Sequence, residues 1–187
     1  MINVIEKTLL RLVETICIAL LLTLAAAVVY STTMRYIGAS PSWYDEIASV
    51  LLAWLTYYGA TYAMFLRQHM GFAGLVTALP SVPAVALAVF SEVLVIAYFA
   101  ITGWFGYAVL KVAAYDALLS LPWLTLDIVQ SVIPVTAALM IIATLLTMPR
   151  ALRDAAAGVD HEHAEIEHAI AEAEAEAEAL ARKDDQK

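Results

Sequence analysis

Four long apolar stretches alternate with short polar connections along the chain. Each stretch is almost free of Asp, Glu, Lys and Arg and reaches the roughly 20 residues that an α-helix needs to cross a bilayer. Clusters of Gly, Pro and charged residues separate the stretches, as expected for turns and loops. The pattern therefore predicts an all-α integral membrane protein with four transmembrane helices, at about residues 13–34, 44–66, 84–110 and 128–149.

Composition supports a membrane location and divides the chain in two. Hydrophobic residues make up 63% of the 187 residues, whereas soluble domains contain roughly 45–50%. Residues 1–149 carry a net charge of −2 and residues 150–187 a net charge of −6. We therefore predict a four-helix transmembrane domain over 1–150 and an acidic, Ala/Glu-rich cytoplasmic tail over 151–187, either helical or disordered. No basic stripe is present, so nucleic acid is not an expected partner.

The cations that flank the predicted helices indicate their orientation. If both termini face the cytoplasm, five of these Lys and Arg residues lie inside, and two, Arg35 and Lys111, lie outside. Because Lys and Arg are enriched in cytoplasmic loops, the pattern predicts both termini inside. The N-terminal run also has the basic start and the Ala25-Ala26-Ala27 site of a cleaved signal peptide. It continues without a break to Met34, however, which favours an uncleaved first helix.

Glu92 is the ionisable residue placed furthest inside a predicted helix, roughly 12 Å from a start at Ala84. A charge at that depth is costly, so the side chain must face protein or water, or be protonated. Two interpretations follow: ion or proton coupling, and a polar contact between helices that includes a contact with a partner subunit. The lack of a basic or acidic companion in another helix favours the polar contact.

The loops supply further candidates. Arg35 and Glu46 flank the short first loop, where they form either an ion pair or two separately solvated charges, and the sequence favours neither. The third loop, with Pro122 and Trp123, is too apolar to be freely solvated and is expected at the membrane interface or against another protein. Pro134 falls inside the fourth helix, where neighbouring helices allow a kink.

Motifs for catalysis are absent. The chain contains no phosphate-binding glycine loop and no H-E-x-x-H sequence, so neither an enzyme nor a cofactor is expected. His161, Glu165 and His168 would share one face of a helix, but in an acidic, solvated tail this spacing does not favour a metal site.

An ordered set of residues resembles a known family. Arg35 and Tyr36 close the first helix, and Pro41, Trp43 and Glu46 open the second with the pattern Pro-x-Trp-x-x-Glu. The remaining members follow in order: Trp54, Gly59, His69, Pro122 and Pro134. At these spacings the set resembles the small membrane subunit of tripartite ATP-independent periplasmic (TRAP) transporters, the DctQ type, over about residues 5–150.

The resemblance implies a function and partners. It implies a scaffold in a bacterial or archaeal cytoplasmic membrane that supports a large DctM-type subunit and docks a periplasmic DctP-type binding protein, for sodium-coupled uptake of a carboxylate. These residues, together with Glu92 and Trp123, are then candidates for contacts with the partners or for a structural motif of the family. The alternative is a self-contained four-helix channel or carrier with Glu92 in its pathway.

Overall fold

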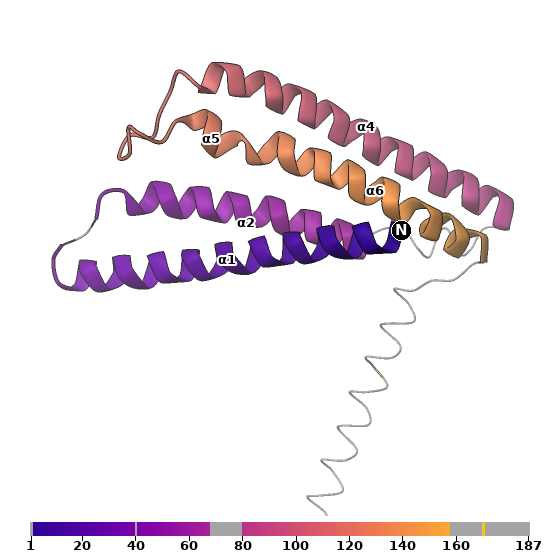
Figure 1. The fold of residues 1–187 in the computed structure, drawn as a ribbon, viewed down its shortest axis with the longest axis horizontal. Coiled ribbons are helices and arrows are strands. Elements are labelled where there is room, and N and C mark those ends of the chain that lie inside the picture. Colours follow the sequence, from indigo (N-terminus) through magenta and orange to yellow (C-terminus); the bar gives the residue numbers. More distant parts are fainter. Residues whose placement is uncertain (1, 40, 68–79, 158–169, 171–187) are drawn as a thin grey trace, which may run out of the picture. The chain divides into compact units, whose positions relative to one another are not determined.

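The computed structural model describes residues 2–39, 41–67, 80–157 and 170. These residues form helices α1 (Ile2–Tyr36), α2 (Tyr44–Leu66), α4 (Ser81–Ala113), α5 (Leu126–Gln130) and α6 (Val132–Ala157). Within them there is no β-strand beyond an isolated bridge between Ala117 and Thr125 (Figure 1). The candidate residue His69 and nearly all of the acidic tail, including His161, Glu165 and His168, lie outside the described residues.

Two compact units make up the chain. One contains Met1–His69 and Ser91–Pro149, and the other contains Met70–Phe90 and Arg150–Lys187. The first unit contains α2 and loop 114–125.

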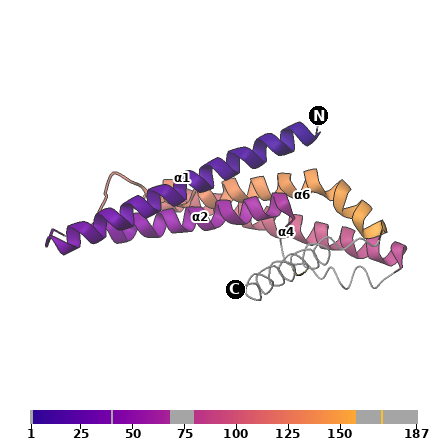
Figure 2. The same ribbon diagram turned by 90° about the horizontal axis from the view of Figure 1, so that it is seen from below.

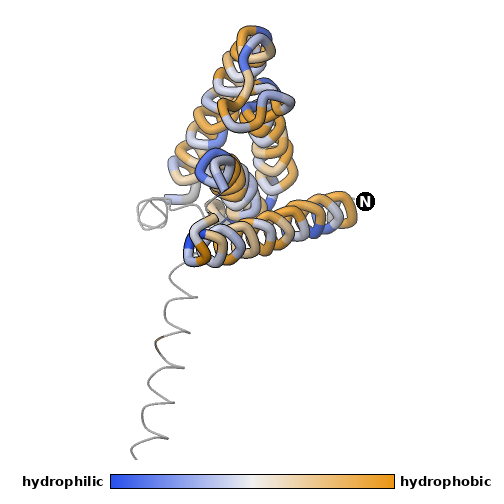
Figure 3. The backbone as a smooth tube through the Cα atoms, turned by 90° about the vertical axis from the view of Figure 1, so that its left-hand side faces the viewer, coloured by the Kyte–Doolittle hydropathy of each residue, from blue (hydrophilic) through white to orange (hydrophobic). Residues whose placement is uncertain are grey.

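The prediction of four transmembrane helices is confirmed. Among the described residues, four helical segments are long and apolar enough to cross a membrane, and orange hydrophobic stretches recur along the helices in Figure 3, between paler and blue ones. They are Val4–Tyr36, Tyr44–Leu66, Val82–Ala113 and Leu126–Ala157, the last of which runs through α5 and α6. The first helix begins at Ile2 rather than near residue 13, because the charged residues at its start are compatible with a helix that extends beyond the apolar run.

A tight turn joins α1 to α2, which lie side by side in Figures 1 and 2. The amide of Ala39 donates to the Met34 carbonyl (2.9 Å) and that of Gly38 to the Arg35 carbonyl (3.1 Å). This pair of bonds is a Schellman motif, which satisfies carbonyls at the end of a helix. Gly38 has a φ of 85°, a conformation that glycine adopts without steric cost. These local hydrogen bonds therefore cap the end of α1 at the first loop.

The fourth transmembrane segment is broken near its start. Helix α5 ends at Gln130, and after Ser131 helix α6 begins at Val132. Pro134 lies inside the fourth membrane-spanning segment, as expected, and the break places it in the first turn of α6, where proline is tolerated. Gly106 of α4 faces this point, and a methyl group there would lie only 3.0 Å from Ile133 Cγ2.

Small and hydroxyl-bearing side chains occupy much of the interior. Val13, Phe65 and Ala143 form a buried cluster that joins α1, α2 and α6. Around it lie buried hydroxyl groups that donate to the carbonyl one turn earlier in their own helix, namely Thr61, Thr136, Thr144 and Thr147. Because these donors are satisfied within each helix, the helices can pack closely around the four hydroxyl groups without leaving them unpaired.

Candidate functional site

One cluster of contacts lies where α2 begins and holds two loops together. Glu46, in the first turn of α2, accepts hydrogen bonds from the Leu119 amide (3.2 Å, at Oε1) and the Ser120 amide (2.9 Å, at Oε2). The Ser120 hydroxyl donates to the Ser42 carbonyl (3.2 Å). We call these four residues, Ser42, Glu46, Leu119 and Ser120, the loop brace. Charge-assisted bonds to a carboxylate are about twice as strong as neutral ones, so Glu46 fixes the position of loop 114–125.

Loop 114–125 is itself compact. The Leu118 amide donates to the Leu124 carbonyl (3.1 Å), and the Leu126 amide donates to the Asp116 carbonyl (2.9 Å). With its backbone folded in this way, the loop exposes large apolar side chains: Tyr115 (90%), Leu119 (93%) and Trp123 (74%). The expected position of the loop at the membrane interface or against another protein stays a prediction.

The loop brace shows which groups Glu46 contacts in place of Arg35. Among the described residues, which include both side chains, Arg35 and Glu46 form no ion pair. Both carboxylate oxygens of Glu46 accept backbone amides of the other loop instead, and Arg35 is exposed at the end of α1. The acceptor was identified from the sequence, but its donors were not, because a backbone amide has no sequence signature.

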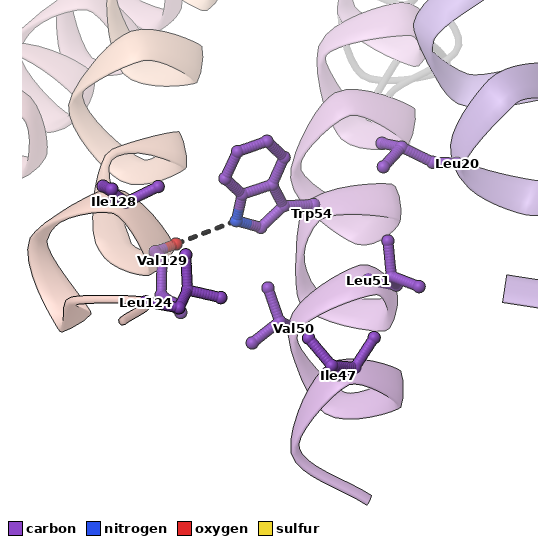
Figure 4. A pocket seen from close by; sticks show the side chains of 8 residues that line it. All are labelled: Leu20, Ile47, Val50, Leu51, Trp54, Leu124, Ile128 and Val129. Carbon is purple, nitrogen blue, oxygen red and sulfur yellow. Dashed lines mark hydrogen bonds between the residues drawn. The ribbon is translucent and has the colours of Figure 1, made fainter. Parts of the chain in front are cut away.

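Trp54 joins α2 to the broken fourth segment. Its indole Nε1 donates to the Val129 carbonyl (2.8 Å), as Figure 4 shows. Val129 lies in the last turn of the short α5 helix, where carbonyls lack partners within the helix. Because this bond satisfies the indole N–H, the rest of the Trp54 ring is apolar. The ring lines a wholly apolar pocket of about 240 Å³. The other lining residues are Leu20, Ile47, Val50, Leu51, Leu124, Ile128 and Val129 (Figure 4).

A second polar cluster lies at the opposite end of α2. Arg67 is the C-cap residue of α2, in a left-handed conformation with a φ of 57°. Its Nη2 forms an ion pair with Oε1 of Glu92, and its Nη1 donates to Thr147 Oγ1 (3.1 Å). Glu92 is only 7% exposed, so it is buried against this partner. The cluster links α2, α4 and α6 through one guanidinium group.

This ion pair corrects the interpretation that Glu92 has no basic companion. Arg67 was counted only as a cation flanking the membrane, yet its side chain reaches the buried carboxylate. The signal that could have identified it is positional. A buried acid in a membrane-spanning helix requires a charged or polar partner, and Arg67 is the cation that ends the described helix before α4. The polar contact between helices is therefore present within this chain.

Comparison with known proteins assigns the chain to a family. The model of the tripartite ATP-independent periplasmic transporters, DctQ component, matches residues 24–154. The chain belongs to this family. A comparison with curated proteins gave no match.

Membership of the DctQ family makes the chain the small membrane component of a TRAP transporter, a multi-pass membrane protein rather than a member of an enzyme family. The match confirms the resemblance found in the sequence. It covers the helices from the middle of α1 onward and both polar clusters described above. No group of three or more metal-binding side chains occurs in the described part of the chain.

The remaining candidates from the DctQ pattern lie apart from one another. Trp43 is the N-cap residue of α2, and its ring stacks on Tyr30 with centroids 6.2 Å apart. Tyr36 is 95% exposed, and Pro122 is exposed in loop 114–125. A methyl group added at Gly59 would meet no atom within 4 Å, so packing within the chain does not require glycine there. Pro41 is half-buried beside the turn. Their role as contact residues stays a prediction.

Proposed function

We propose that this DctQ-family chain is the membrane scaffold of its TRAP transporter. In this proposal it supports the large DctM-type subunit and offers part of the docking surface for the periplasmic DctP-type binding protein. The observation that carries the proposal is the loop brace. Two charge-assisted bonds to Glu46 hold a loop that exposes Leu119 and Trp123, and a fixed apolar surface suits recognition of a partner.

The orientation of the helices supports this assignment. The distribution of Lys and Arg favours a cytoplasmic location for both termini, and in that orientation the loop brace faces the periplasm. A soluble binding protein would approach from that side. The proposal places the chain in the cytoplasmic membrane of a bacterium or archaeon, the membrane in which TRAP transporters operate.

The polar chemistry of the chain also suits a scaffold. Glu92 is engaged by Arg67, and that guanidinium also binds Thr147, so this carboxylate serves to hold helices together. Sodium coupling and a carboxylate substrate rest on the resemblance to TRAP systems and not on any residue of this chain. Both would be handled by the large subunit and the binding protein.

Replacing Glu46 tests the docking surface. Glu46→Ala removes both acceptors of the loop brace, and we expect docking of the binding protein to weaken about tenfold, since hydrogen bonds to charged groups contribute roughly 1.5–3 kcal/mol. Asp45→Ala is the matched control, because it removes the same charge from an exposed neighbour. The measurement is binding of the purified DctP-type protein to the membrane complex in nanodiscs. Equal binding by the two variants would contradict the proposal.

A further inference from the structure

Helix α4 has two sides of different chemistry. One side packs against α6, where a methyl group added at Gly103 would lie 3.4 Å from Ala137 Cβ and one at Gly106 would lie 3.0 Å from Ile133 Cγ2. The other side exposes large apolar side chains along consecutive turns. We call it the aromatic face of α4, and it consists of Leu94 (53%), Tyr98 (63%), Ile101 (59%), Trp104 (73%) and Phe105 (63%).

The aromatic face lies at the depth of the hydrocarbon core. Glu92 marks one boundary, because it pairs with Arg67 at the end of α2, and Lys111 marks the other. Tyr98 and Trp104 lie between these charges, each within about 5 Å of the midpoint at 1.5 Å per residue. Tyr and Trp side chains in membrane proteins usually lie at the two interfaces with water, not at the centre.

Both side chains carry a hydrogen-bond donor at this depth. Within the described residues, neither the Tyr98 hydroxyl nor the Trp104 indole N–H has a hydrogen-bond partner. Lipid chains offer no acceptor, so a donor that faces them remains unsatisfied at a cost in free energy. These two groups therefore require an acceptor from another protein surface, which lipid cannot supply.

Helix α1 provides the contrast within the same chain. Its exposed side chains at the corresponding depth are aliphatic, as at Leu21 and Leu22, and need no polar partner. Its exposed aromatic residues, Tyr30 and Tyr36, lie towards the turn, and Tyr30 stacks on Trp43. The exposed aliphatic side chains of α1 can therefore face lipid without an unsatisfied hydrogen-bond donor, whereas Tyr98 and Trp104 of α4 cannot.

We propose that the aromatic face of α4 is the surface on which the large membrane subunit packs. The proposal rests on the proposed function for the existence of that subunit. The partner surface is expected to be a transmembrane helix that presents oxygen acceptors at mid-membrane depth, from Ser, Thr or Asn side chains or from irregular backbone. Contacts of this kind, together with close packing, drive helix association in lipid.

Site-specific photocrosslinking in the native membrane tests the contact. A benzophenone amino acid at Ile101, in the centre of the aromatic face, should crosslink to a protein of the size of the large subunit, and the same group at Leu21 on α1 should not. A crosslink to the large subunit from Leu21 alone would overturn the inference while leaving the scaffold function intact. A crosslink from Ile101 to a second copy of this chain would also overturn it.

Removing the two donors tests their role. Tyr98→Phe removes only the hydroxyl, and Trp104→Phe removes the indole N–H while keeping a smaller aromatic ring. Each should weaken co-purification of the large subunit about threefold, the typical effect of one hydrogen bond between membrane helices. Tyr107→Phe is the matched control, because Tyr107 is exposed on the same helix beside Lys111, which lies 5.1 Å from its ring centroid. Equal retention by all three variants would contradict the inference. Failure of the unmodified chain to retain any large subunit would instead contradict the proposed function itself.

Discussion

At the scale of single residues, Arg67 is the residue that joins α2, α4 and α6. It caps α2, pairs with Glu92 and donates to Thr147. The two partners of the ion pair differ in their surroundings, because the Arg67 side chain is 35% exposed and that of Glu92 only 9%. This difference predicts an asymmetry between the two single substitutions.

Arg67→Ala should destabilise the protein more than Glu92→Gln. The first change leaves a buried carboxylate without a partner, for which a loss of about 3 kcal/mol is typical. The second leaves an arginine that can turn towards water, and its cost should be near 1 kcal/mol. Thermal unfolding of the purified chain in detergent measures both effects.

Two further variants control this comparison. Arg35→Ala removes an exposed arginine that is not paired with Glu46, so it should change stability by less than about 0.5 kcal/mol. The double variant Arg67→Ala with Glu92→Ala should be more stable than Arg67→Ala alone. If the double variant were the less stable of the two, the buried carboxylate would not be the cause of the loss.

At the scale of the helices, the contact between α4 and α6 depends on two glycines with different tolerances. A methyl group at Gly103 would make an ordinary contact of 3.4 Å, whereas one at Gly106 would press on Ile133 at 3.0 Å. Gly106 also faces Pro134, at the point where the fourth segment is broken, so little adjustment is available there.

We therefore expect Gly106→Ala to destabilise the protein by about 1–3 kcal/mol through overpacking. Gly103→Ala should be close to neutral, and Gly59→Ala should be neutral or slightly stabilising, since its surroundings are open and alanine favours helix. The same unfolding assay ranks the three variants. A ranking in which Gly59→Ala is the most harmful would show that Gly59 has a packing role that this chain alone does not reveal.

The helices were also the part of the fold that the sequence predicted well. Each membrane-spanning segment must bury its own backbone hydrogen bonds and carry an apolar surface, so about 20 residues of local sequence suffice to identify it. The break at Ser131 and the ion pair between Arg67 and Glu92 depend instead on how distant segments approach one another. The partners of Glu46 are backbone amides of Leu119 and Ser120, which any residue type supplies, so no sequence pattern could identify them.

At the scale of the whole molecule, the proposed function requires a defined orientation in the membrane. The loop brace must face the periplasm, with both termini in the cytoplasm. In a Cys17→Ser background, Ala39→Cys should react with a membrane-impermeant maleimide added from the periplasm, and Ala157→Cys should react only after the membrane is opened. Both positions lie on exposed parts of the described chain. Labelling of position 157 in intact cells would place this position in the periplasm and contradict the proposed orientation.

The central claim is that this DctQ-family chain supports transport without carrying it out. The most direct test is reconstitution into liposomes with an imposed sodium gradient, with the chain alone and with the large subunit and binding protein that co-purify or are encoded beside it. We predict uptake of a carboxylate substrate in the complete system and none with this chain alone. Sodium-driven uptake by the isolated chain would contradict the account.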